Sequence, residues 1–445
     1  ARAIAAVPRR TPRRLVAGCG IALNLAALGY FKYANFFFAN WNDAFDTDFV
    51  VRVALPLGIS FFTFQQIAYL ADAAREKVGA VGNTGSGGGG ADRDFVRYAL
   101  FVSFFPQLIA GPIVHHGEMM PQFARSKPSA WRRNLAVGST IFILGLAKKV
   151  LLADNLAPLA SPVFDAAAAG AAVSMADAWL AALAYSFQIY FDFSGYSDMA
   201  VGLGWMFGVR LPMNFASPYK ARSIVDFWRR WHLTLSRFLR DYLYIPLGGR
   251  SRRYVNVFVT MLLGGIWHGA GWTFVLWGAL HGMMIVVSQA RASRLAQPAP
   301  AGVRRVRAVA MTFLLVMIAW VPFRAANMEA VTVMYGAMAG LSDAAGAAFL
   351  ADAKQRHLAA LAGALLIAFF APNTAVFMRR VRPVLALPGY PASRVGGGGG
   401  AGLRAGGTAA LAWAPSPAWA VAMALLFAFV VLNLNAPSEF IYFQF

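Results

Sequence analysis

The chain from Tyr190 to Gly282 reads YFDFSGYSDMA at 190–200, SIVDFWRRWHLTLSRFLRDYLYIPLGG at 223–249 and LLGGIWHGAGWTFVLWGALHG at 262–282. Charged and polar residues concentrate in these segments, whereas the sequence around them is mostly apolar. Ionisable groups are costly to hold inside a membrane, so such a concentration indicates a functional site. We therefore expect the stretch 185–290 to form the core of that site.

The composition indicates that this core lies in a membrane. Hydrophobic residues make up 59% of the 445 residues and charged residues 13%, whereas an average soluble domain has about 25% charged residues. The formal net charge of +21 suggests nucleic acid, but Lys and Arg stand in short clusters between apolar runs. That distribution is typical of the cytoplasmic loops of membrane proteins. We therefore predict a polytopic membrane protein and no nucleic-acid partner.

Apolar runs near the ~20 residues that cross a bilayer recur along the chain. They are Leu15–Phe31, Val50–Ala71, Phe95–Val114, Asn134–Leu152, Val173–Phe191, Ala308–Phe323, His357–Ala371 and Ala418–Leu434. With the shorter core segments, we expect roughly nine to eleven membrane-embedded helices. The fold class predicted is an all-α polytopic membrane protein, with residues 1–445 in a single domain. The only cysteine, Cys19, excludes disulfides within the chain and paired-thiol chemistry.

Two segments conflict with a simple topology, because basic sequence flanks each of them on both sides. The segment 95–114 contains Pro106 and Pro112, and the segment 194–211 contains four glycines. Broken or re-entrant helices remove the conflict, and such backbone is tolerated at membrane depth where it is buried in protein or lines a wet cavity. We predict that both segments are broken and wall a funnel that opens to the cytoplasm. The glycine-rich or polar stretches 82–94, 290–307 and 391–407 are expected to be flexible connectors.

His268 is the first candidate for catalysis. It lies at the end of an apolar run among glycines that allow close helix approach, and Trp267 and Trp272 are expected to form flat walls beside it. A neutral imidazole in an embedded segment can accept a proton near neutral pH, as a general base for a hydroxyl must. The alternative interpretation is a histidine that only holds two helices together by hydrogen bonds.

His232 lies in Asp226–Tyr242, which at 100° per residue forms one amphipathic helix. One side of this helix is mostly charged, and His232 lies at the edge of the other, apolar side. The arginines suit an anionic headgroup or the phosphates of a nucleotide-bearing donor. The alternative is a solvated interfacial face that only orients the protein. The candidate substrate-binding residues here are Trp228, Arg229, Arg230 and Arg237, and Trp267 is added from the neighbouring segment.

Asp192, Tyr196 and Asp198 form a short polar run with Ser194 and are candidate substrate-binding residues. GxSxG is absent, so structural hydrogen bonding and cavity lining is a better interpretation than a serine nucleophile. HExxH and CxxC spacings are also absent, and we expect no metal site. A GxxxxGK[ST] phosphate loop is missing, which argues against an ATP-driven pump.

The three core segments resemble the membrane-bound O-acyltransferase superfamily and, within it, the branch of the alginate O-acetyltransferase membrane subunit. FFPQLIAGPIVHHGEMMPQF at 104–123 and FIYFQF at 440–445 are similar to that branch as well. The resemblance therefore runs from about Val50 to Phe445. Against it, we expect a missing first helix and glycine-rich insertions near 87–90 and 396–400.

The resemblance implies a multi-helix bundle around a central tunnel or funnel, with re-entrant helices. It implies that His268 is the essential catalytic residue and His232 the second functional position. Related members pass an acyl group across the bacterial inner membrane to a periplasmic acetyltransferase partner, which places it on an exported polysaccharide such as alginate. Acetyl-CoA, or an acylated carrier protein, is then the expected donor, as a substrate rather than a bound cofactor.

Other functions stay open at this point. Within the enzyme class, the acceptor is alternatively peptidoglycan, cellulose, or a teichoic acid that receives D-alanine. From another class, a carrier or flippase for a lipid-linked sugar would use the arginines to hold phosphate. The sequence has no internal repeat, which weighs against the inverted-repeat transporters.

Overall fold

The computed structural model describes residues 10–50, 53–56, 58–75, 95–108, 111–124, 130–294, 302–342, 344, 348–351, 354–385 and 413–434. Within these ranges the chain is helical and holds no β-strand, only an isolated bridge between Pro212 and Leu385. The predicted all-α class is confirmed. The glycine-rich stretches at 82–94 and 391–407, residues 295–301 of the connector at 290–307 and the closing FIYFQF lie outside the described residues. The prediction of a flexible connector is wrong for 290–294 and 302–307, because these residues continue α15 and begin α16.

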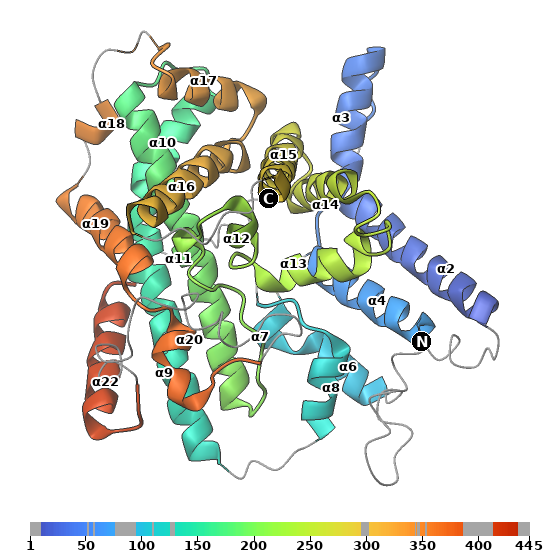
Figure 1. The fold of residues 1–445 in the computed structure, drawn as a ribbon, viewed down its shortest axis with the longest axis vertical. Helices are drawn as coiled ribbons and strands as arrows, with labels where there is room; N and C mark the ends of the chain where they lie inside the picture. Colours follow the sequence, from blue (N-terminus) through green and yellow to red (C-terminus); the bar gives the residue numbers. More distant parts are fainter. Residues whose placement is uncertain are drawn as a thin grey trace.

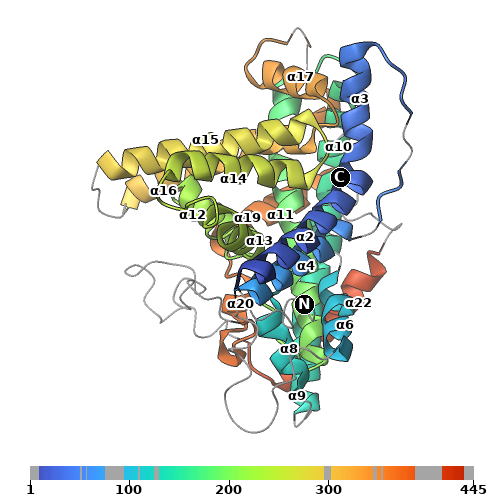
Figure 2. The same ribbon diagram turned by 90° about the vertical axis from the view of Figure 1, so that its right-hand side faces the viewer.

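The helices follow one another along the chain in the order drawn in Figures 1 and 2. They are α2 (Arg10–Leu28), η1 (Gly29–Tyr33), α3 (Ala34–Phe45), α4 (Ile59–Ala74), α6 (Phe95–Ser103), α7 (Phe105–Leu108), α8 (His116–Ala124), α9 (Trp131–Ala147), η3 (Lys148–Ala153), α10 (Asp154–Ala168), α11 (Met175–Met206), η4 (Pro218–Lys220), α12 (Ile224–Trp228), α13 (Leu233–Leu239), η5 (Arg240–Tyr244), α14 (Arg253–His268), α15 (Trp272–Arg294), α16 (Gly302–Arg324), α17 (Met328–Met338), α18 (Ala348–Ala351), α19 (Gln355–Phe370), α20 (Thr374–Phe377), η6 (Arg379–Val381) and α22 (Pro417–Leu432).

Four helical stretches in the described part of the chain are long and apolar enough to span a membrane. They are Arg13–Phe45, Trp131–Ala168, Trp272–Arg291 and Gly302–Arg324. Two shorter apolar helices, α19 and α22, accompany them. The protein is therefore a multi-pass membrane protein. In the first two stretches the chain passes through a π-helical turn, η1 or η3, without leaving the helix.

Helices α9 and α10 follow each other end to end through η3, and α11 runs beside both along the longest axis of the molecule (Figure 1). Glycines set how closely α9 and α11 approach. A Cβ on Gly138 would lie 2.5 Å from the carbonyl oxygen of Gly202, and a Cβ on Gly145 would lie 2.5 Å from that of Gly195. Small residues of this kind let two backbones pack in contact inside a membrane.

The predicted break in the segment 194–211 is therefore wrong. Helix α11 is continuous through Gly195, Gly202 and Gly204 and ends at Met206. Glycine costs only about 1 kcal/mol in a helix, which close packing offsets. The break predicted for 95–114 is confirmed, because α6 ends at Ser103 and a separate short helix, α7, holds Pro106.

The prediction of one amphipathic helix over Asp226–Tyr242 is also wrong. Helix α12 ends at Trp228, and α13 begins only after His232, which has a left-handed backbone (φ +43°). A strand-like segment supplies the hydrogen bonds that the helix gives up. The N–H of Ala216 donates to the carbonyl of Arg230 at 2.9 Å, and the N–H of Leu233 donates to that of Asn214 at 2.9 Å.

Candidate active site

His268 is the last residue of α14, at the turn of the α14–α15 hairpin. Glycines make the hairpin tight, since a Cβ on Gly265 would lie 2.4 Å from the carbonyl oxygen of Phe274 on the returning helix. A Cβ on Gly269, the next residue along the chain, would fall into the Phe274 ring. The close helix approach predicted from the glycines around His268 is confirmed.

Aromatic rings enclose the His268 imidazole, which is 6% exposed. The ring centroids of Trp267, Trp277 and Phe323 lie 4.9, 5.0 and 5.1 Å from that of His268. We call these three residues the aromatic shell. The prediction that Trp272 forms a wall is wrong, because its side chain is 57% exposed and its indole N–H donates to Asn40 Oδ1 at 2.7 Å.

The carbonyl groups at the end of α14 bond to side chains of η1, within the helical stretch Arg13–Phe45. Lys32 Nζ donates to the carbonyls of Trp267 (2.6 Å) and His268 (3.1 Å), and the Tyr33 hydroxyl donates to that of Ile266 (2.8 Å). The last carbonyls of a helix have no partners within it and carry a partial negative charge. A buried ammonium satisfies both needs, so Lys32 fixes the backbone that carries His268.

His232 is fully buried, and its hydrogen bonds define its tautomer. Asn214 Oδ1 accepts two hydrogen bonds from Thr234, one from its backbone N–H (3.4 Å) and one from its hydroxyl (2.9 Å). The Thr234 hydroxyl oxygen in turn accepts from the backbone N–H of Ile113 (3.0 Å). Asn214 Nδ2 donates to Ser197 Oγ at 3.2 Å, which fixes the amide orientation. Asn214 Oδ1 is thus an acceptor, and His232 Nδ1, 3.0 Å away, must donate to it. The lone pair of the neutral ring is left on Nε2.

The Nε2 atom of His232 has no hydrogen-bond partner among the described residues, although it is buried. His232 and Lys32 both lie within electrostatic range of His268. The fold therefore brings together the two histidines that the sequence singled out. Between them they offer a ring nitrogen that can accept a proton or a hydrogen bond.

A cavity lies beside the Asn214 that holds His232. It is lined by Ser194, Ser197, Asp198 and Thr374 among other residues. The hydroxyl of Ser194 is buried and has no partner in the part of the chain that the structure describes. Asn214 is itself a lining residue, so the polar groups of the cavity lie next to the side chain that holds the His232 imidazole. The tunnel implied by the resemblance stays a prediction.

The acidic residues predicted to bind substrate pair with lysines of η3. Lys149 contacts Asp192 (2.8 Å) and Asp154 (2.8 Å), and Lys148 contacts Asp198 (2.5 Å). Asp192 is 1% exposed. Tyr196 lies half-buried on the same helix, α11. These contacts agree with the structural interpretation of the run, and a role in substrate binding stays a prediction.

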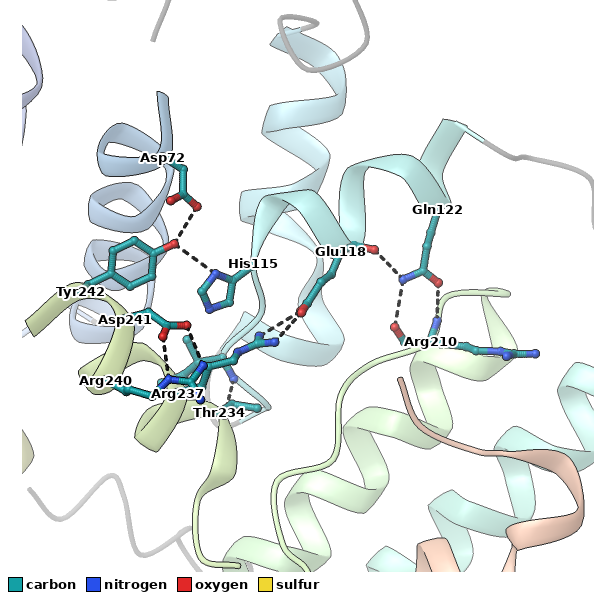
Figure 3. A network of polar contacts seen from close by, with 11 residues as sticks. Asp72, His115, Glu118, Gln122, Arg210, Thr234, Arg237, Arg240, Asp241 and Tyr242 are labelled. Carbon is teal, nitrogen blue, oxygen red and sulfur yellow. Dashed lines mark hydrogen bonds and ion pairs between the residues drawn. The ribbon is translucent and has the colours of Figure 1, made fainter. Parts of the chain in front are cut away.

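The three arginines of the predicted anion site lie in different surroundings. Figure 3 shows Arg237 pointing at Glu118 of α8, with which it forms a two-pronged ion pair, one N···O distance being 3.0 Å. Arg230 contacts Asp226 at 3.0 Å. Arg229 lies exposed in the break between α12 and α13. The structure therefore does not gather the three guanidinium groups into one stripe.

The Arg237 side chain is one part of a larger polar network in Figure 3 that joins three segments of the chain. The Tyr242 hydroxyl donates to Asp72 Oδ2 at 2.7 Å and lies 3.2 Å from His115 Nδ1. A buried arginine is stable only with a partner of opposite charge. This network therefore anchors α13 and η5 against α4 and α8.

Sequence reasoning missed Asn214 and Lys32, and it assigned no role to His281, the third histidine of the core segments. Asn214 carries no local signal, since its role depends on residues 17 to 20 positions away. Lys32 gives a signal in retrospect, because it is an isolated cation within an apolar run. His281 lies in one of the quoted segments, and its Nδ1 accepts from the Trp228 indole N–H at 3.2 Å.

The protein-family model of the membrane-bound O-acyltransferase family matches residues 21–332. This chain belongs to that family. A peptidoglycan O-acetyltransferase of Helicobacter pylori is 47% identical over 351 residues, which cover 74% of this chain and 66% of that protein. A probable alginate O-acetylase AlgI of Azotobacter vinelandii is 46% identical over 334 residues, 73% of this chain and 62% of that protein.

A teichoic acid D-alanyltransferase of Streptococcus thermophilus is more distant, at 27% identity over 251 residues, which cover 53% of this chain and 57% of that protein. The chain thus spans about two thirds or less of the length of each of these relatives. The similarity to alginate O-acetylases that the core segments implied is confirmed.

Proposed function

We propose that this protein is a membrane-bound O-acetyltransferase of the bacterial inner membrane. It moves an acetyl group from a cytoplasmic thioester, acetyl-CoA or an acylated carrier protein, toward an exported cell-envelope polysaccharide. The observation that carries the proposal is the buried His268 in its aromatic shell, within electrostatic range of His232, whose Nε2 lone pair is free among the described residues. The similarity to two O-acetylating proteins supports the choice of acyl group.

In the proposed reaction His268 acts as general base. It takes the proton from a hydroxyl as the oxygen attacks the thioester carbonyl carbon, and a C–O bond forms while the C=O electron pair moves to oxygen. The carbonyl then re-forms, the C–S bond breaks, and the thiolate takes the proton from His268. His232 orients the bound substrates by accepting a hydrogen bond from one of them at Nε2.

The aromatic shell supports this chemistry because it is dry. Water that reached the thioester would hydrolyse it, and rings packed at about 5 Å around His268 leave no room for bulk solvent. The break at His232 supports it as well. A left-handed backbone at a residue other than glycine costs roughly 1–3 kcal/mol and clusters at functional sites.

The acceptor is the point on which relatives differ. The similarities to a peptidoglycan O-acetyltransferase and to alginate O-acetylases are nearly equal, so both polymers belong in the test. We propose that a periplasmic acetyltransferase partner receives the acetyl group and selects the polymer. A membrane assay must therefore include the candidate polymer and its partner protein.

The test is acetyl transfer in membranes that carry wild-type protein or His268→Gln, supplied with radiolabelled acetyl-CoA. Label is counted in peptidoglycan, in alginate and as free acetate. We expect the substitution to lower labelling about 10²- to 10⁴-fold, the usual contribution of a general acid–base group. Equal labelling by a His268→Gln variant that inserts normally would overturn the role of His268. Absence of label with the wild type, across both polymers and with acylated carrier protein as donor, would overturn the acetyltransferase.

A further inference from the structure

A third histidine, His281, lies fully buried on α15 next to the aromatic shell. Its ring centroid is 4.8 Å from that of Trp277, which is itself 5.0 Å from His268. Trp277 and His281 are four residues apart and therefore lie on the same face of α15.

The hydrogen bond from Trp228 fixes the tautomer of His281. An indole N–H can only donate, so His281 Nδ1, 3.2 Å from Trp228 Nε1, must be the acceptor. The proton of the neutral ring then lies on Nε2. This is the opposite tautomer to that of His232, whose Nδ1 donates to Asn214.

The N–H group on His281 Nε2 has no acceptor among the residues that the structure describes. The indole N–H groups of Trp267 and Trp277 are likewise buried without an acceptor in those ranges. A buried donor that makes no hydrogen bond is destabilising, so three of them around one imidazole call for an explanation. Donors without acceptors fit a ligand that brings only acceptors.

Resting on the proposed function, we propose that His281 donates from Nε2–H to the carbonyl oxygen of the acyl group, with the Trp277 indole as the second donor. As the acceptor oxygen attacks, the C=O electron pair moves onto this oxygen, and the negative charge forms beside the two N–H groups. His281 transfers no proton in this step. When the C–S bond breaks, the pair returns and the carbonyl re-forms.

This assignment gives the two free Nε2 atoms complementary roles. In this proposal the lone pair of His232 accepts a hydrogen bond from a substrate group that carries a proton. The N–H of His281 donates to the acyl carbonyl oxygen, which gains negative charge. Preformed donors in a dry site act most strongly on charge that develops in the transition state. The effect of losing His281 should therefore fall on kcat rather than on KM.

The experiment measures kcat and KM for acetyl-CoA in His281→Phe and His281→Gln. Phenylalanine keeps a ring but removes both nitrogens, whereas glutamine keeps an N–H to donate and an oxygen to accept from Trp228. We expect kcat to fall about 10²- to 10³-fold in His281→Phe with KM within threefold of wild type, and to recover at least tenfold in His281→Gln.

The control is His357→Phe, the same change at a buried histidine on α19, outside the site. It should keep wild-type kcat, and thermal unfolding in detergent reports whether each variant folds. A folded His281→Phe with wild-type kcat, or a folded His281→Gln as slow as His281→Phe, would overturn this inference. Both results leave the proposed function intact, because that fails only if the wild type transfers no acetyl group.

Discussion

Two regions of the molecule differ in how their buried polar groups are satisfied. One is the layer where η3 packs on α11, and the other is the site around His268. In the layer, Lys148 and Lys149 each contact an aspartate of α11 at 2.5–2.8 Å. Around His268, by contrast, the Nε2 atoms of His232 and His281 are buried and make no hydrogen bond within the described ranges. Paired charges hold a fold together, whereas unmet hydrogen-bonding capacity is kept where a ligand can use it. Paired charges therefore mark the scaffold, and buried nitrogens without a hydrogen bond mark the site.

Breaking a pair in the layer should have the largest effect on the fold. We expect Lys149→Met to lower the free energy of unfolding by roughly 3–5 kcal/mol, because it leaves the Asp192 carboxylate, 1% exposed, without its cation. Thermal unfolding in detergent, followed by tryptophan fluorescence, measures the loss.

The matched control is the double variant Lys149→Met with Asp192→Asn, which removes both charges. It should recover most of the stability that the single variant loses. If Lys149→Met alone melted at the wild-type temperature, the ion pair between Lys149 and Asp192 would not stabilise the fold.

Removing the hydrogen-bond partner of His232 should lower activity more than it lowers stability. We expect Asn214→Leu to lower kcat roughly 10- to 100-fold, because His232 then loses the acceptor that holds its proton on Nδ1. Asn214→Asp keeps an acceptor at the same place and should retain more activity than Asn214→Leu. Steady-state kinetics on both variants checks this, and equal losses would show that Asn214 acts only through packing.

The smallest effect is expected at the rim of the shell. Trp272→Phe removes an exposed hydrogen bond to Asn40 and should cost less than about 1 kcal/mol of stability. Acetyl transfer should stay within twofold of wild type, since Trp272 does not contact the His268 ring. A large loss in the same membrane assay would return Trp272 to the site, as the sequence had suggested.

Much of the fold could be predicted from the sequence because the hydropathy of the local sequence determines where membrane helices form. The break at Pro106 could be predicted as well, since proline acts on its own helix. The continuous α11 and the interrupted segment around His232 could not. Whether Gly202 breaks a helix or packs it depends on Gly138, 64 positions earlier, and the break before α13 depends on hydrogen bonds from residues 214–216.

The same reason limits what the sequence says of the site. His268 and His232 stand out because histidine is rare in apolar sequence. The orientation of the His232 ring cannot be read from the sequence, because Asn214 fixes it, just as Trp228 fixes the ring of His281. A residue type can be read from the chain, but a tautomer is a property of the neighbours that folding supplies.

The contact between Lys32 and the end of α14 has a consequence for how the protein is made. The ammonium and the Trp267 carbonyl are 235 positions apart, so the ribosome delivers the cation long before its partner exists. Until α14 inserts, the first helix carries a charge that the bilayer disfavours. The last step that relieves this charge also sets the backbone of His268. Insertion of α14 and fixing of the backbone that carries His268 are therefore one event during biogenesis.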